Sequence, residues 1–129
     1  MSGKRLLDTS VIVALFRGDD QLRARLAAAA EVYLSATVVG ELYYGARLTP
    51  EPEKTLKEVT RLADIVPVLA CDRDTASQYS LIKVALRRRG TPLPENDIWI
   101  AAIAIQHGFS LATRDQHFSA IDGLAIESW

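Results

Sequence analysis

Four acidic residues stand in apolar segments of this 129-residue chain, where a hydrophobic core has no need of charge. Asp8 follows two leucines in LLDTSVIVALF, and Glu41 lies in TVVGELYYGA. Asp97 lies in PENDIWIAAIA, and Asp115 lies in LATRDQHF. Because burying an unpaired carboxylate is expensive, these residues indicate a site that uses their charge.

Single members of this set also have ordinary structural explanations. Asp97 and its neighbour Asn96 are residue types that commonly cap a helix N-terminus, and Asp115 is a typical turn residue. Asp8 and Glu41 are harder to explain in this way, since hydrophobic residues flank both of them. The structural explanations compete poorly if all four acids meet at one place.

Carboxylates that meet at one place repel one another. At an effective dielectric near 20, two charges ~5 Å apart cost roughly 3 kcal/mol, and a divalent cation would relieve that cost. Oxygen ligands without a Cys or His cluster favour Mg²⁺ or Mn²⁺ over Zn²⁺ or copper. Such a cation commonly activates a water and neutralises phosphate oxygens, so the acids predict metal-dependent phosphoester hydrolysis.

The elements that must position these acids alternate between short β-type runs and longer helical patterns, which predicts an α/β fold with a mostly parallel sheet. The expected strands are 5–7, 32–35, 65–69, 110–113 and 124–127, and the expected helices are 21–30, 38–48, 51–63, 74–89 and 98–106. The last helix is apolar on every side and should be buried, ending at Gly108. In a parallel sheet the carboxyl ends of strands and the N-termini of the following helices share one edge, so all four acids are expected there.

Composition bounds the remaining possibilities. The chain has the length of one domain, so residues 1–129 should form a single unit. Fifteen basic against 16 acidic residues leave a net charge of −1, so no global positive field points to a polyanionic partner. The one cysteine cannot form an internal disulfide, and no apolar run approaches the roughly 20 residues of a membrane span. We therefore expect a cytoplasmic protein without a membrane segment.

A basic run, Arg87, Arg88 and Arg89, closes the expected helix 74–89. These side chains are possible RNA contacts, since a helix end of this kind can follow a phosphate backbone. The other explanation is a solvated helix end whose positive charges suit the helix dipole. His107 and His117 stand alone in the sequence, and we expect surface or hydrogen-bonding residues there rather than ligands.

The segments LLDTSVIVALF, ELYYGA, NDIWIAAIA, LATRDQHF and GLAIESW follow one another as in a known family. In these segments the chain resembles the PIN-domain ribonucleases, most closely the VapC-type toxins of toxin–antitoxin pairs, over nearly its whole length. The resemblance implies a PIN-domain fold and endonucleolytic cleavage of RNA by a metal-activated water. It also implies that Mg²⁺ or Mn²⁺ is held by Asp8, Glu41, Asp97 and Asp115.

The same resemblance extends to supporting residues and partners. Ser10 and Thr113 match positions that commonly support the acidic cluster by hydrogen bonding. The family resemblance further implies a homodimer, an RNA substrate and a cognate VapB-type antitoxin that occludes the active site. Gln116 and His117 stand where some relatives carry a further acid, which counts against a complete second metal site.

Two other functions remain open. Haloacid-dehalogenase-like phosphatases also begin with a strand that ends in Asp, but they need a second Asp two residues later, where this chain has Ser10. A catalytically idle PIN-type binding module for RNA or protein is the other alternative. Such modules usually lose some of the four acids, and all four are present here.

Overall fold

The computed structural model describes residues 3–29 and 31–129. Within them, all strand pairings are parallel, and one sheet has the strand order β3-β2-β1-β4-β5. The strands are β1 (Lys4–Leu7), β2 (Glu31–Ser35), β3 (Val68–Leu69), β4 (Ser110–Thr113) and β5 (Ile126–Ser128). The helices are α1 (Thr9–Phe16), α2 (Asp20–Ala28), α3 (Ala36–Arg47), α4 (Pro52–Ile65), α5 (Arg73–Arg89) and α6 (Glu95–His107), with a 3-10 turn, η1 (Gln116–Ala120). The prediction of an α/β fold around a parallel sheet is confirmed.

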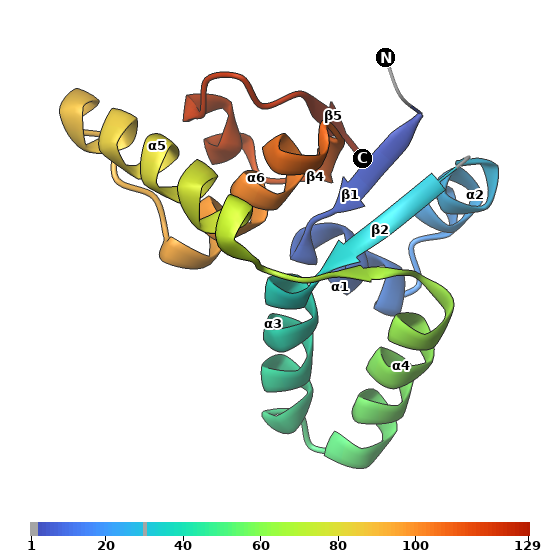
Figure 1. Cartoon of the computed structure of the whole chain (residues 1–129). Coiled ribbons are helices and arrows are strands. Elements are labelled where there is room, and N and C mark those ends of the chain that lie inside the picture. The colour runs from blue at the N-terminus through green and yellow to red at the C-terminus, as the bar shows by residue number, and fades with distance from the viewer. Residues whose placement is uncertain (1–2, 30) are drawn as a thin grey trace.

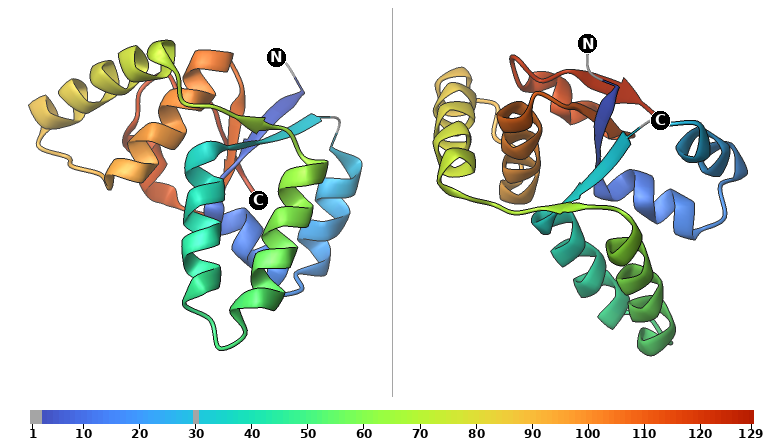
Figure 2. Two further views of the ribbon diagram at one scale, coloured as in Figure 1. Left: turned by 60° about the horizontal axis from the view of Figure 1, so that its bottom comes forward. Right: turned by 45° about the vertical axis from the view of Figure 1, so that its right-hand side comes forward.

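The helices form layers around this sheet. Figure 1 and the right-hand view of Figure 2 show α5 and α6 packed together on one side, while α1 and α2 lie on the other. Helices α3 and α4 pair with each other and project from the sheet (Figure 2). Leu6, Leu7, Leu34 and Leu111 of the central strands are buried between the layers. In the part of the chain that the structure describes, no helix is long and apolar enough to cross a membrane.

Helix α6 is the buried helix that the sequence predicted. Six of its residues are buried on all sides of the helix: Ile98, Ile100, Ala101, Ala102, Ile103 and Ala104. The helix ends at Gly108, whose positive φ of 70° is the left-handed conformation that glycine adopts most easily.

Two strand boundaries differ from the expectation. The strand expected over 65–69 is wrong in its first half, because α4 continues through Ile65 and the paired strand is limited to Val68–Leu69. Pro67 explains this boundary: it has no N–H with which to continue the helix, and its carbonyl accepts a hydrogen bond from the Leu34 amide at 2.9 Å. The last strand begins at Ile126, two residues later than expected.

Two helices also differ. Helix α1 was given no range among the expected helices; its sequence, TSVIVALF, is apolar and rich in the β-branched residues that favour strands. The helix expected over 21–30 ends at Ala28, and Ala30 lies outside the described residues. These differences leave the carboxyl edge of the sheet where the sequence placed it.

Candidate active site

The register of β1 and β4 builds the centre of the acidic edge. Leu7 pairs with Ala112, and the Asp8 amide donates a hydrogen bond to the Ala112 carbonyl at 2.9 Å. Asp8 and Thr113 therefore leave neighbouring strands at the same level.

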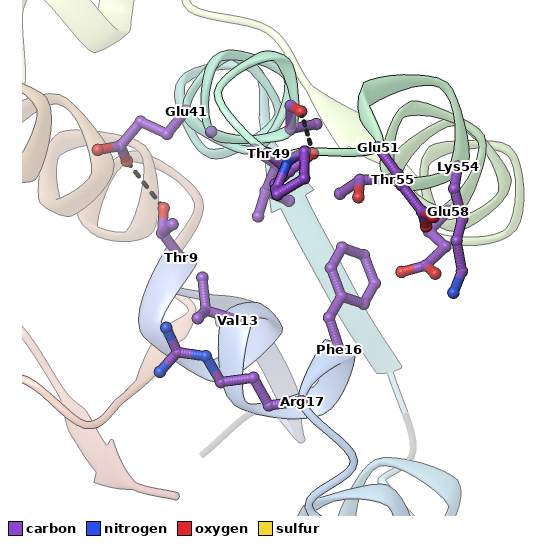
Figure 3. A pocket seen from close by; sticks show the side chains of 14 residues that line it. Thr9, Val13, Phe16, Arg17, Glu41, Thr49, Glu51, Lys54, Thr55 and Glu58 are labelled. Atoms are coloured by element: carbon purple, nitrogen blue, oxygen red, sulfur yellow. Dashed lines mark hydrogen bonds between the residues drawn. The ribbon is translucent and has the colours of Figure 1, made fainter.

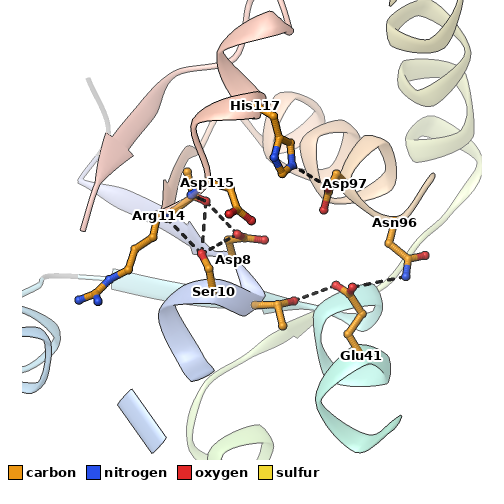
Figure 4. A network of polar contacts seen from close by, with 10 residues as sticks. Asp8, Ser10, Glu41, Asn96, Asp97, Arg114, Asp115 and His117 are labelled. Atoms are coloured by element: carbon orange, nitrogen blue, oxygen red, sulfur yellow. Dashed lines mark hydrogen bonds and ion pairs between the residues drawn. The ribbon is translucent and has the colours of Figure 1, made fainter. Parts of the chain in front are cut away.

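The four acids reach this edge from four different elements. Asp8 stands between β1 and α1, Glu41 in the second turn of α3, Asp97 in the first turn of α6, and Asp115 just after β4. Figure 4 shows Asp8, Asp97 and Asp115 directed toward one region, with Glu41 nearby.

Asp8 is the most enclosed of the four acids. It is only 2% exposed, and its Oδ2 accepts hydrogen bonds from Ser10 Oγ and Thr113 Oγ1, both at 2.8 Å. The Ser10 hydroxyl is fixed in turn by the Arg114 amide, which donates to it at 3.1 Å. Two hydroxyl donors on one oxygen stabilise the buried carboxylate and fix its orientation. The hydrogen bonds expected from Ser10 and Thr113 are present.

Glu41 is held by neighbours of the other acids. Thr9, the residue after Asp8, donates from Oγ1 to Glu41 Oε1 at 2.8 Å. Asn96, the residue before Asp97, donates from Nδ2 to Glu41 Oε2 at 3.4 Å. The start of α1 and the start of α6 are thereby tied to the same side chain of α3 (Figure 4).

Asp97 lies 2.7 Å from a histidine, measured from its Oδ2 to His117 Nε2. Burial of the Asp97 carboxyl raises its pKa above the usual range, the His117 contact opposes that shift, and the charges of Asp8 and Glu41 add to it. Asp8 and Glu41 therefore lie close enough to Asp97 for their negative charges to repel its charged form. The capping explanation for Asp97 is wrong, because Pro94 holds the N-cap position of α6 and no side chain caps it.

Asp115 is the most exposed acid of the group. Its amide donates to Thr113 Oγ1 at 3.0 Å, so the hydroxyl that supports Asp8 also fixes the backbone of Asp115. It is the N-cap residue of η1, and its side chain makes no capping hydrogen bond. Thr113 therefore links the backbone of Asp115 to the side chain of Asp8.

Sequence reasoning missed three residues that touch the acids: Thr9, Asn96 and His117. Each lies within two residues of one of the acids in sequence, and that adjacency is the signal that was available. His117 was expected to be a surface or hydrogen-bonding residue, and it is both, with a side-chain exposure of 38%. What the sequence did not reveal is that its partner is Asp97.

The donor set fits a hard cation that keeps part of its hydration. Asp8 uses Oδ2 for both of its hydrogen bonds, and carboxylate oxygens dominate the edge. Among the described residues, no three side chains of Asp, Glu, His or Cys are close enough to hold one ion as they stand. Zn²⁺ is commonly held by three or four protein ligands rich in His and Cys, whereas Mg²⁺ is commonly held by one or two carboxylates together with waters and substrate phosphates.

The basic run at the end of α5 has no contact with the acids in the described residues. Arg89 is engaged elsewhere: it pairs with Asp122 at 3.4 Å and donates to the Ala120 carbonyl. Arg87 and Arg88 are exposed in the last turn of α5. Their contact with RNA stays a prediction.

Comparison with known proteins gives the family. The model of the PIN domain family matches residues 5–124. The chain belongs to the PIN-domain family. The ribonuclease VapC5 of Mycobacterium tuberculosis is 32% identical to it over 93% of this chain and 89% of its own length. The tRNA(fMet)-specific endonuclease VapC of Salmonella typhimurium is 30% identical over 98% of both chains.

A solved structure extends the similarity to three dimensions. The DNA-bound VapBC of Salmonella typhimurium contains a chain that superposes with a TM-score of 0.90 at 30% identity, over 98% of each chain. Within the PIN domains, this chain is a VapC-type ribonuclease toxin of a toxin–antitoxin system. The alternative of a haloacid-dehalogenase-like phosphatase is thereby wrong.

Proposed function

We propose that this VapC-type chain is a Mg²⁺- or Mn²⁺-dependent endoribonuclease whose catalytic site consists of Asp8, Glu41, Asp97 and Asp115. The observation that supports this most directly is that four acids from four different elements meet at the carboxyl edge of the sheet. Burial raises the pKa of Asp97, and the nearby charges of Asp8 and Glu41 add to that shift. Acids gathered where they destabilise one another favour a catalytic role over a structural one. This clustering also argues against an idle binding module.

The chain's own residues fix the geometry for in-line hydrolysis. Ser10 and Thr113 hold Asp8 in one orientation, and Thr9 and Asn96 hold Glu41. Asp8 and Asp97 would hold the cation, with Glu41 and Asp115 completing its surroundings. When bound, Mg²⁺ or Mn²⁺ would neutralise phosphate oxygens and lower the pKa of a water.

We further propose that a VapB-type antitoxin occupies a cleft between α1, α3 and α4. The cleft has a volume of about 640 Å³, and Thr9 and Glu41 belong to its lining (Figure 3). Val13, Phe16 and Leu42 supply apolar surface farther along. A peptide with apolar side chains and one basic residue would fill this lining and set a positive charge against Glu41. Such a peptide would close the active site from one side.

The remaining partners follow from the family. The Salmonella relative acts on tRNA(fMet) by its name, so a transfer RNA is the first substrate to test here. The homodimer stays a prediction that light scattering of the purified protein would check. An RNA substrate and a co-expressed antitoxin favour the cytoplasm as the compartment.

The decisive experiment is an RNA cleavage assay with Mg²⁺, Mn²⁺ or EDTA, with analysis of the product ends. We expect cleavage only with metal, leaving a 5′-phosphate and a 3′-hydroxyl. Full activity in EDTA, or fragments that end in a 2′,3′-cyclic phosphate, would contradict the proposal. Induced expression without antitoxin should arrest growth, and Asp8→Asn should relieve the arrest.

A further inference from the structure

A second cavity lies beside the cleft assigned to the antitoxin, shares Val13 and Arg17 with it, and adjoins the acidic edge through Ser10. It has a volume of about 390 Å³, and Ser10, Ala14 and Arg17 of one face of α1 line it together with Arg114. Ser10 is the residue that donates to Asp8 Oδ2. The cavity therefore runs along α1 from the acidic cluster to Arg17.

The two arginines of this cavity differ in how their charges are compensated. Arg114 forms an ion pair with Asp19 at 2.7 Å and donates from Nε to the Trp129 carbonyl at 2.9 Å. The side chain of Arg17 is exposed and has no ion pair or hydrogen bond within residues 3–29 and 31–129. Arg17 is thus the cation of this cavity whose charge is available to a ligand.

The position of Arg17 suits a nucleic-acid strand that enters the active site. Seven residues of helix separate it from Ser10, about 10 Å along the axis at 1.5 Å per residue. That distance corresponds to about three nucleotides of a stacked strand at 3.4 Å per step. Side chains on a helix lean toward its N-terminus, and Figure 3 shows the guanidinium of Arg17 pointing back along α1 toward Thr9.

We propose that Arg17 binds a backbone phosphate of the RNA substrate, about one to three nucleotides from the scissile bond, with the strand lying in the cavity between Ser10 and Arg17. This inference rests on the proposed ribonuclease function and adds a subsite to it. The contact is independent of sequence, because a guanidinium recognises phosphate oxygens and not base edges.

The test is binding of a fluorescent oligouridylate of about 12 nucleotides, a length typical of single-strand sites, in EDTA so that hydrolysis is suppressed. Arg17→Ala should weaken binding about three- to ten-fold, as expected for one partly exposed charge-assisted contact. The slope of log affinity against log salt should become shallower by about 0.7, the value for one phosphate on a single strand. Arg17→Lys should restore the slope, because it keeps the charge.

Arg23→Ala is the matched control, since Arg23 is also exposed and lies outside the cavity. It removes the same charge and should leave the salt slope unchanged. A series of oligonucleotides, each with one phosphate replaced by a neutral methylphosphonate, should show weaker binding to the wild type at one linkage. The same replacement should cause no further loss of affinity in the Arg17→Ala variant. Equal affinity and slope for the Arg17→Ala and Arg23→Ala variants would overturn the subsite.

Two outcomes would distinguish failure of the Arg17 subsite from failure of the proposed ribonuclease function. If the wild type binds RNA through Arg17 but cleaves no RNA with any metal, the ribonuclease proposal fails and the phosphate site stands. If Arg17→Ala leaves RNA binding unchanged and weakens only the antitoxin complex, the subsite is wrong, and Arg17 belongs to the cleft of Figure 3, which it also lines.

Discussion

Asp8 and Asp97 lie on the same acidic edge, yet the protein stabilises their charges to different degrees. Asp8 is almost fully buried and receives two hydroxyl hydrogen bonds at 2.8 Å. Asp97 is also largely buried, and its pKa is raised because burial outweighs the contact with His117. Hydrogen bonds from the protein thus stabilise the charged form of Asp8. The charged form of Asp97 is disfavoured by its surroundings.

The difference follows from the elements that carry them. Asp8 leaves a central strand, so the neighbouring strand can present Thr113 to it in fixed register. Asp97 lies on a helix, where the dipole favours its charge. Among the described residues, the side chain that bonds it is His117, which comes from a separate turn. The orientation of Asp8 is therefore fixed before a cation binds. A bound cation would stabilise the charge of Asp97 more than that of Asp8.

The largest effect is expected on RNA cleavage, in a comparison of the Asp8→Asn and Asp97→Asn variants. Both should lower RNA cleavage by about 1,000-fold, the scale of losing a preorganised electrostatic group. Without metal, Asp97→Asn should keep or raise the melting temperature because it relieves repulsion. Asp8→Asn should lower it, because charge-assisted hydrogen bonds become neutral ones.

Thermal melts with and without Mg²⁺ beside the cleavage assay provide the measurement. The wild type should melt higher as metal is added, and both variants should show a smaller shift. An active Asp97→Asn protein with an undiminished metal shift would remove Asp97 from the proposed site.

The next effect concerns the support of Asp8. Thr113→Val removes a buried hydroxyl that donates to Asp8 and accepts from the Asp115 amide, so it should cost about 1–3 kcal/mol of unfolding free energy. Thr60→Val is the matched control: Thr60 is exposed and bonds only the Tyr43 hydroxyl, so its change should stay within about 0.5 kcal/mol. Urea unfolding of both variants measures the difference, and equal stabilities would show that Thr113 does not support Asp8.

The sequence predicted the positions of these acids better than it predicted their environments. The alternation of strands and helices was sufficient to place Asp8, Glu41, Asp97 and Asp115 at one edge, because parallel sheets share that geometry. The pairing of Thr113 with Asp8 depends on register, which two short strands do not encode locally. The contact of His117 with Asp97 depends on the path of η1, a short turn with no periodic pattern.

The errors in the fold have local causes of the same kind. No helix range was predicted over TSVIVALF, whose β-branched residues favour strands and whose burial reflects tertiary packing. Ile65 was assigned to a strand, since a short apolar run near a turn does not distinguish a strand from a helix end. Neither error displaced one of the four acids, because Asp8 precedes α1 and Ile65 lies outside the central strands β1 and β4.

A smaller effect is expected from the partner of Asp97. His117→Ala should weaken metal binding about ten-fold, as for other side chains that orient a ligand without touching the ion. Stability should change little, because the pair is partly exposed. His117→Gln keeps a donor and should recover part of the affinity. The midpoint of the metal-induced rise in melting temperature reports this, and an unchanged midpoint in His117→Ala would show that Asp97 needs no such orientation.

The smallest expected effect is a pH dependence of stability without metal. The folded-state pKa of Asp97 lies above its unfolded value, so the folded state binds the proton more tightly. The stability that this provides is fully present below the unfolded pKa and is lost as the pH rises through the folded one. Asp97→Asn lacks this dependence, so its unfolding free energy relative to wild type should rise across that window and then level off.

Urea unfolding at a series of pH values in EDTA measures that difference, and His117→Ala moves it in a defined direction. Because His117 lowers the pKa of Asp97, removing it should shift the window to higher pH. Saturating Mg²⁺ should reverse the trend, since the ion binds the deprotonated carboxylate and its affinity increases with pH. A difference between wild type and Asp97→Asn that is independent of pH, with and without metal, would mean that Asp97 carries no unfavourable charge, and its contrast with Asp8 would disappear.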